Sequence, residues 1–375
     1  MSCISVLIPD GESAFALPVL QCLAVQKDVK IYAISSNPRS RIRYSRHLSG
    51  FFLFKGGENL GNAWLSFVKV VLLQENIDVL LPVDESTIRY ISSNRDIFKG
   101  ITSLAPLPDV GSFDIAVNKW TLAQWVNERA IPCPLTLDCS EERNVDEDII
   151  AINFPVLLKP KQGSGGKGIE FYDCLESLFL RFSKSADTDK FILQSFIHGY
   201  DIDCSVLCKE GEVLAHTVQK RPEMGNGRFT PAPNIDFLEN QEVLSLVKEV
   251  VRTLNWNGVV HFDLRYDESE NRVKIIEMNC RFWASITGSL GAGVNFPYLS
   301  CLVAKDIPFE SPDYQQNRFV NAGTALKIKC KDWFGMNKSM EFYDRSSLEF
   351  ILRDPIPFFY ERLNGFGRIF KNGKA

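Results

Sequence analysis

The first third of the chain alternates short apolar runs with amphipathic stretches. Four apolar runs have the length of buried strands, at residues 3–9, 29–34, 51–54 and 77–83. Two stretches between them, 13–26 and 63–74, repeat apolar residues at helical spacing. Strand, helix and strand in this order predict a parallel sheet covered by helices. We therefore expect residues 1–113 to form an α/β domain of Rossmann-like topology.

From Phe154 onward the hydrophobic period shortens to two, which is typical of antiparallel strands. Strand-like runs occupy residues 155–160, 168–173, 191–197, 201–208, 212–219, 259–266 and 272–279. One helix interrupts them, because apolar residues recur at helical spacing within 241–256. A helix that Asn118 caps precedes the series. The pattern predicts an α+β part after the first domain; the resemblance described below implies its division into residues 114–190 and 191–330, with an extension of unknown role at 331–375.

Composition and charge narrow the class of protein. With 45% apolar and 23% charged residues among 375, the chain has the composition of a globular protein with more than one core. Its formal net charge of −4 argues against a nucleic-acid partner. The ten cysteines show neither a CxxC pair nor zinc-ligand spacing, and we find no signal peptide and no membrane-spanning run. We therefore expect a cytoplasmic protein that is not integral to a membrane.

The glycine-rich stretch "KPKQGSGGKGIE", residues 159–170, is the first candidate for chemistry. Gly163, Gly165 and Gly168 satisfy GxGxxG, but a strand-like run follows instead of the helix that a dinucleotide site requires. A P-loop would need glycine at 161 and Ser or Thr at 168, and the protein-kinase motifs HRD and DFG are absent. Two interpretations remain: a flexible hairpin that covers phosphates, with Lys159 on the incoming strand, or a plain surface hairpin.

A second group of polar residues lies in the last two predicted strands. Glu277 and Asn279 share a face of one strand because side chains alternate, and a hairpin would bring Asp263 beside them. Two carboxylates and an amide oxygen suit Mg²⁺ that holds nucleotide phosphates. Arg281 continues the same face and is suited to charge on a transferred phosphoryl group. The alternative is a set of unrelated polar positions on a half-solvated sheet.

Taken together, these motifs resemble the ATP-grasp superfamily, in the branch of carbamoyl phosphate synthetase, biotin carboxylase and stand-alone amino-acid ligases. The resemblance covers roughly residues 1–330 and implies a pre-ATP-grasp domain followed by a two-subdomain ATP-grasp fold. It implies that ATP contacts Lys119, Lys159, the lid residues Gly163, Ser164, Gly165, Gly166 and Gly168, and the hinge "LQSFIHGYD" with Gln194, Ser195, Phe196, Ile197 and Asp201. Asp203 rivals Asp201 for the ribose. The metal ligands would be Asp263, Glu277 and Asn279, with Arg281 at the reacting groups.

The family chemistry implies ATP and Mg²⁺ as cofactors, with Mn²⁺ as a possible substitute. The carboxylate of a small molecule, such as an amino acid, a peptide or a sugar acid, would attack the γ-phosphate of ATP. An amine, or less often a thiol, would then displace phosphate from the acyl phosphate. Outside the family motifs, the candidate substrate contacts are Glu85, Lys220, Arg221 and Arg228. The alternatives are a helix cap for Glu85 and a solvated surface loop for the three cations. Two alternatives are an enzyme that phosphorylates bicarbonate and a non-catalytic ATP-binding subunit. Relatives of this kind are often homodimers. Trp283 stands where relatives usually have a smaller residue, which affects the acceptor pocket.

Overall fold

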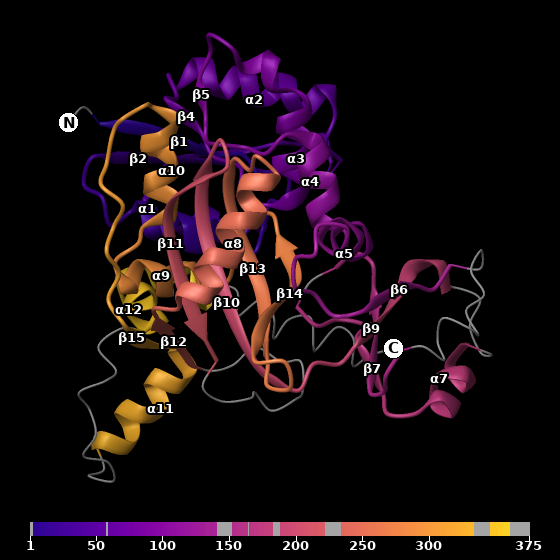
Figure 1. Ribbon diagram of the computed structural model, residues 1–375. Helices are drawn as coiled ribbons and strands as arrows, with labels where there is room; N and C mark the ends of the chain where they lie inside the picture. The colour runs from indigo at the N-terminus through magenta and orange to yellow at the C-terminus, as the bar shows by residue number, and fades with distance from the viewer. Residues whose placement is uncertain are drawn as a thin grey trace, which may run out of the picture.

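The computed structural model describes residues 3–57, 59–140, 152–163, 165–182, 188–221, 234–333 and 346–360. Within them the chain forms three sheets of five, four and six strands (Figure 1). The class is therefore mixed α/β and α+β, with a parallel sheet first and antiparallel sheets afterwards, as the change in hydrophobic period predicts.

The five-stranded sheet comprises β1 (Ile4–Ile8), β2 (Val29–Ser35), β3 (Leu48–Leu53), β4 (Val79–Leu80) and β5 (Ser103–Leu104). Its order is β3-β2-β1-β4-β5, and every neighbouring pair is parallel. Helix α1 (Ala16–Leu23) packs on one face, and α2 (Asn62–Gln74) and α3 (Glu85–Ser93) pack on the other. Because the chain turns in opposite directions from β1 and β4, the loops after these two strands border a crevice of the kind that holds ligands.

The four-stranded sheet contains the glycine loop. Its strands are β6 (Thr136–Asp138), β7 (Val156–Pro160), β8 (Glu170–Tyr172) and β9 (Phe191–Ser195), in the antiparallel order β6-β9-β7-β8. The loop joins β7 to β8, so a strand follows it, as the sequence predicts. Helix α5 (Lys119–Asn127) leads to this sheet, and the Asn118 side chain caps it by accepting from the N–H groups of Trp120 and Thr121.

The six-stranded sheet has the antiparallel order β14-β13-β10-β11-β12-β15. The strands are β10 (Gly199–Lys209), β11 (Glu212–Lys220), β12 (Asn234–Leu238), β13 (Gly258–Asp267), β14 (Arg272–Asn279) and β15 (Asn317–Val320). Helix α8 (Gln241–Thr253) covers one face, where Val206 and Val260 meet Val247. On the other face, Leu207 and Val259 belong to the core that includes α9 (Ile286–Ala292) and α10 (Phe296–Ala304).

A β-bulge in β14 decides which side chains face the site. Ile275 pairs with Leu264 in the core, and Glu277 pairs with Asp263, so Ile276 is the extra residue between them. In a regular strand Glu277 would share the core face of Ile275, because side chains alternate. The bulge moves Glu277 and Asn279 to the opposite face, and bulges are common beside active sites.

The remaining helices connect these sheets or lie near the end of the chain. They are α4 (Val110–Val117), α7 (Leu175–Phe182), α11 (Ala322–Trp333), α12 (Ser347–Arg353) and the 3-10 turns η1 (Arg41–Tyr44), η2 (Arg95–Phe98) and η3 (Thr188–Lys190). The residue after α12, Asp354, is buried and accepts from the Ser45 hydroxyl and the Arg46 N–H, which fixes this segment to the first domain. Each helix in the described part of the chain falls short of the length and apolarity needed to cross a bilayer.

Candidate active site

Asp263 on β13 and Glu277 and Asn279 on β14 form a cluster in the structure, which we call the polar row. Asp263 lies opposite Glu277 across the strand pair, and His261 lies opposite Asn279. The Asn279 amide donates to Glu277 Oε1 over 3.3 Å. The structure therefore brings the three predicted metal ligands to one face.

Two buried lysines approach this cluster from α5 and β7, which lie outside the six-stranded sheet. Lys119, the first residue of α5, contacts Glu277 Oε2 at 2.8 Å and donates to the Gly163 carbonyl at 2.9 Å. Lys159 on β7 donates to Gln194 Oε1 at 2.6 Å. Burial lowers the pKa of Lys159 to about 8, although the charge of Glu277 acts in the opposite direction.

The glycines of the loop are required by its backbone conformation. Gly163, Gly165, Gly166 and Gly168 have φ angles of 125°, 70°, 72° and 74°, in the range that residues with a side chain rarely adopt. At Gly168 a Cβ atom would also come within 3.0 Å of the Pro160 ring. Ser164 lies outside the described residues. The loop thus brings the Gly163 carbonyl within hydrogen-bonding distance of Lys119.

The predicted hinge begins at the end of β9 and runs into β10. Gln194 is buried and bridges Lys159 to the Thr136 hydroxyl, to which its amide donates at 3.1 Å. The N–H groups of Ser195 and Phe196 donate to the carbonyls of Leu135 and Pro155. The Ile197 carbonyl accepts from Arg265, which also pairs with Asp201. Two of the amides assigned to adenine are therefore engaged within the protein.

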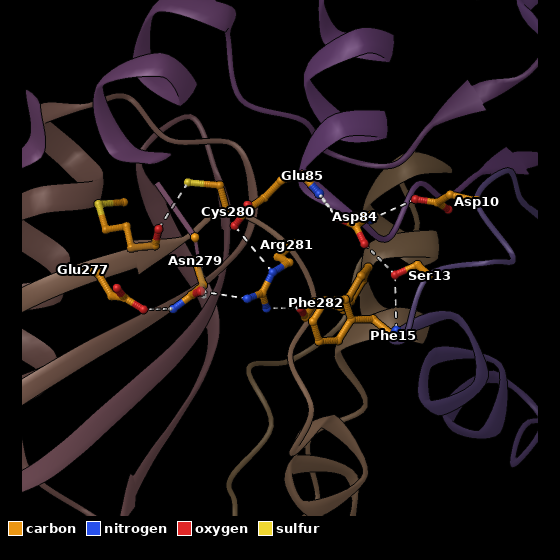
Figure 2. Close-up of polar contacts among 12 residues, drawn as sticks. Asp10, Ser13, Phe15, Asp84, Glu85, Glu277, Asn279, Cys280, Arg281 and Phe282 are labelled. Carbon is orange, nitrogen blue, oxygen red and sulfur yellow. Dashed lines mark hydrogen bonds and ion pairs between the residues drawn. The ribbon is translucent and has the colours of Figure 1, made fainter. Parts of the chain in front are cut away.

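Arg281 lies between the six-stranded sheet and the segments that follow β1 and β4 (Figure 2). Its guanidinium donates to Asn279 Oδ1 at 2.8 Å and to the Phe282 carbonyl at 2.9 Å. Its Nε lies 3.5 Å from Glu85 Oε1, and its Cζ lies 4.3 Å from the centre of the Phe15 ring. Glu85 follows β4 and Phe15 follows β1, so both approach from the crevice at the carboxyl ends of the parallel sheet.

The polar row continues onto β10, where the sequence motifs predict no metal ligand. Asp203 on β10 lies opposite Asp263, and its Oδ2 is 3.5 Å from Arg221 and 3.4 Å from the Gln219 amide. His261 lies 3.2 Å from Asp263 Oδ1 and 2.8 Å from the Ser205 hydroxyl. Possible ligand atoms of Asp203, His261 and Asp263 lie within 4.8 Å of one another. Alternation along β10 is the signal that could have placed Asp203 and Ser205 on this face.

The charges of this cluster favour a bound cation. Burial and the facing Asp263 carboxylate raise the pKa of Glu277. Burial also acts to raise the pKa of Asp263, but His261 and Arg221 hold it below its usual range. Burial raises the pKa of Asp203 to about 6 against the opposing charge of Arg221. A divalent cation would relieve the repulsion between the paired carboxylates.

The candidate substrate contacts have different positions. Glu85 is in the site, and Arg221 lies at the end of the polar row. Lys220 pairs with Ile202 on the other face of the sheet, with its Nζ 3.4 Å from the centre of the Tyr200 ring, so the structure does not bring it to the metal ligands. Arg228 lies outside the described residues. Trp283 is buried, and its ring stacks on the His261 ring with the ring centres 5.5 Å apart, so it packs against a residue beside Asp263.

The site combines paired carboxylates on an antiparallel sheet with a glycine hairpin and two buried lysines. This combination is typical of a class of domains that bind a nucleotide and a metal. The ATP-grasp domain family matches residues 116–285, which include Lys119, the glycine hairpin and the polar row. Residues 116–285 therefore match an ATP-grasp domain, as the motifs of the sequence predict.

Relatives of known name support the same family. D-aspartate ligase of Enterococcus faecium is 24% identical over 264 residues, which cover 63% of this chain and 59% of that protein. Carbamoyl-phosphate synthase of Methanobrevibacter smithii is 23% identical, over 57% of this chain and 59% of its own length. This chain thus spans about three fifths of the length of the curated relatives.

The fold is also similar to solved structures. An ADP complex of N5-carboxyaminoimidazole ribonucleotide synthetase superposes with a TM-score of 0.67 at 14% identity, covering 89% of this chain and 87% of that one. This match extends well beyond residues 116–285, so the arrangement of all three sheets belongs to a known fold.

Proposed function

We propose that this protein is an ATP-dependent carboxylate–amine ligase that forms an acyl phosphate on a small-molecule acid. The observation that carries the proposal is the convergence of Lys119, Asp263, Glu277, Asn279 and Arg281 in one site. The name of D-aspartate ligase supports the assignment to carbon–nitrogen ligases. A non-catalytic ATP-binding subunit would have lost one of these positions, and none is lost.

ATP would lie between the glycine hairpin and the six-stranded sheet. Lys119 and Lys159 would contact its phosphates, because both are buried cations beside the metal ligands. Adenine would lie against the backbone of residues 194–197. Asp201 suits the ribose better than Asp203, because its side chain is 39% exposed whereas that of Asp203 is 2% exposed.

Asp263, Glu277 and Asn279 would hold the metal. Their oxygen donors match the preference of Mg²⁺, and Mn²⁺ accepts the same ligands. When bound, the metal neutralises charge on the triphosphate and orients its γ-phosphate. Lys119 now neutralises Glu277, so it is free to contact a phosphate once a metal takes over that carboxylate.

The residues of this chain would assist two substitutions. In the first, a carboxylate oxygen of the substrate bonds to the γ-phosphorus while the bond to ADP breaks, and Arg281 stabilises the negative charge. In the second, the amine nitrogen attacks the acyl carbon, loses a proton, and expels inorganic phosphate. The glycine hairpin would exclude water that competes with the amine.

The proposal also gives roles to the parts of the chain. Residues 1–113 would be a Rossmann-like pre-ATP-grasp domain, which their β3-β2-β1-β4-β5 order supports. Residues 114–190 would be the lid subdomain, and residues 191–330 the metal-binding subdomain. Small-molecule acids and amines would be the partners, and a homodimer is the expected assembly.

The test measures ADP release by the full chain with ATP, Mg²⁺ and a panel of acids, each with and without a panel of amines. A ligase should release ADP only with a particular acid, and the amine should appear in an amide product. Turnover with bicarbonate alone would instead support a bicarbonate-phosphorylating enzyme. No ADP release with any acid, despite tight ATP binding, would contradict the proposal.

A further inference from the structure

Three exposed apolar side chains lie close together near the end of the described chain. Leu352 lies on the exposed side of α12, and Ile356 and Phe359 follow it in a further helical turn. They are 68%, 56% and 60% exposed, and they are three of the ten large apolar side chains exposed among the described residues. Phe350 on α12 is buried instead. Single exposed apolar residues are ordinary, but a group of them marks a surface that contacts a partner.

An arginine-rich segment packs against this group. Residues 39–47, "RSRIRYSRH", contain four arginines and no carboxylate. Asp354 accepts two hydrogen bonds from this segment, and the Tyr44 and Tyr360 rings lie with their centres 4.0 Å apart. Residues 39–47 and 346–360 therefore form one surface, which we call the arginine–apolar face.

The arginine–apolar face is positively charged, although the whole chain is not. Its two segments contain five arginines and two carboxylates, a formal net charge of +3, whereas the chain has a net charge of −4. Of the two carboxylates, Asp354 is buried and Glu349 pairs with the arginine at the end of α12. Arg39, Arg43 and Arg46 are exposed, so the charge that this face presents to a partner is positive.

Arginines beside exposed aliphatic side chains match the surface of an anionic membrane. Apolar side chains enter the boundary between headgroups and acyl chains, and arginines are attracted to the negative charge of the lipids. A second copy of this chain matches the face less well, because a two-fold contact would bring its arginines near their own copies. Single-stranded nucleic acid would use aromatic rings for stacking, whereas Leu352 and Ile356 are aliphatic.

We propose that the arginine–apolar face binds the surface of a membrane that contains anionic phospholipids. Leu352, Ile356 and Phe359 enter the headgroup region, and the arginines of residues 39–47 contact the lipid phosphates. The sequence that continues from this face, residues 361–375, lies outside the described residues and contains four cations and one carboxylate, so its charge has the same sign. The proposal is independent of the ligase proposal, because binding to vesicles requires neither ATP nor turnover.

Sedimentation with lipid vesicles tests this proposal. The full chain is mixed with vesicles of phosphatidylcholine alone, or with vesicles that also contain about one quarter phosphatidylserine, at about 0.1 M salt. The partition coefficient should be at least about 10-fold higher on the anionic vesicles, and it should fall as the salt concentration rises. Binding to neither kind of vesicle, or equal binding to both, would overturn the proposal.

Arg39→Gln combined with Arg46→Gln tests the charge of the face. Binding to anionic vesicles should weaken about 5-fold for each arginine removed. Lys27→Gln combined with Lys30→Gln is the matched control, because it removes two exposed cations near the start of β2, whereas residues 39–47 follow its end. Equal losses in the two double variants would overturn the assignment to this face.

Ile356→Ser combined with Phe359→Ser tests the apolar side chains. Binding to anionic vesicles should weaken by at least about 10-fold. Val70→Ser combined with Leu73→Ser on α2 is the matched control, because these side chains are similarly exposed, at 57% and 60%, and this variant should bind as the unmodified protein does. Unchanged binding in the first variant, or an equal loss in the control, would overturn the proposal.

Sedimentation velocity without lipid examines the competing occupant of the face, a second copy of the chain. A dimer of the unmodified protein that dissociates in the variant with Ile356→Ser and Phe359→Ser would assign the face to that second copy and overturn the proposal. The same oligomeric state in both proteins, together with the loss of vesicle binding, would support it. Thermal unfolding of each variant checks that the fold is retained.

Discussion

The two groups of residues that meet at Arg281 differ in how far apart they lie in the sequence. Asp263, Glu277 and Asn279 belong to a single hairpin, and one bulge sets their register. Phe15 and Glu85 follow strands of the parallel sheet and reach Arg281 only because this sheet lies beside the six-stranded sheet. The hairpin group is local and holds the metal in our proposal, whereas the distant group shapes the substrate pocket.

Glu277→Gln should have the largest effect, because it tests the hairpin group that holds the metal in our proposal. The amide keeps the size of the side chain but removes the charge that pairs with Lys119 and with the metal. We expect kcat to fall by about 1000-fold, a loss typical of removing a group that stabilises the transition state. ADP release measures the change. Glu12→Gln is the control and should keep its activity, because the Glu12 carboxylate is exposed and accepts from the Ser36 N–H and hydroxyl. Turnover within a few-fold of the unmodified protein would contradict the metal assignment.

Lys159 should make nucleotide binding depend on pH. Its pKa lies at about 8, below the usual value of a lysine, because the side chain is buried. As the pH rises through about 8, Lys159 loses its proton and the phosphates lose a cation, so ATP affinity should fall by up to about 10-fold per pH unit.

Lys159→Arg is the control for this dependence, because arginine keeps its charge over the whole range. Titrations of ATP with Mg²⁺ at several pH values should show a flatter profile for Lys159→Arg. An unmodified protein whose affinity stays constant from below pH 8 to well above it would refute the role of Lys159.

Phe15→Leu tests the group of residues that lies far from Arg281 in the sequence, and it should lower turnover moderately. The substitution keeps an apolar side chain but removes the aromatic ring beside Arg281. Cation–π contacts contribute about 0.5–2 kcal/mol, so kcat should fall by about 3- to 30-fold while ATP affinity stays unchanged. Phe51→Leu is the matched control, because it removes a similar contact with Arg43 away from the site. An equal effect of the two variants would contradict a specific role for Phe15.

Asp354→Ala should change stability and leave turnover intact. It leaves the Ser45 hydroxyl and the Arg46 N–H without their acceptor in a buried contact. We expect the free energy of unfolding to fall by about 1–3 kcal/mol. Denaturant unfolding measures this change, and a large loss of kcat would show that the segment after α12 also supports the site.

Much of the fold follows from local patterns. The periods of two and 3.6 predict the central strands and the amphipathic helix α8, and the glycine loop is a hairpin because a strand-like run follows it. β5 has only two residues, and β12 and β15 lie toward an edge of their sheet, so these strands carry little periodic signal.

The site is predictable where strand alternation determines it. Glu277 and Asn279 share a face as predicted, although the bulge at Ile276 is what turns that face toward the site. The contacts of Arg281 with Phe15 and Glu85 depend on how the parallel sheet packs beside the six-stranded sheet. The hydrophobic period along the chain does not predict that packing. Lys220 illustrates the same limit, because the register of β11 turns it away from its neighbour Gln219 and from the polar row.

The most direct measurement follows heavy oxygen from the substrate carboxylate. The acid that supports ADP release is labelled with heavy oxygen in its carboxylate and incubated with the protein, ATP, Mg²⁺ and the amine, and the inorganic phosphate is analysed by mass spectrometry. Through an acyl phosphate, one labelled oxygen should appear in each phosphate released. Label that stays entirely in the acid and the amide, or that appears in AMP, would contradict the proposed reaction.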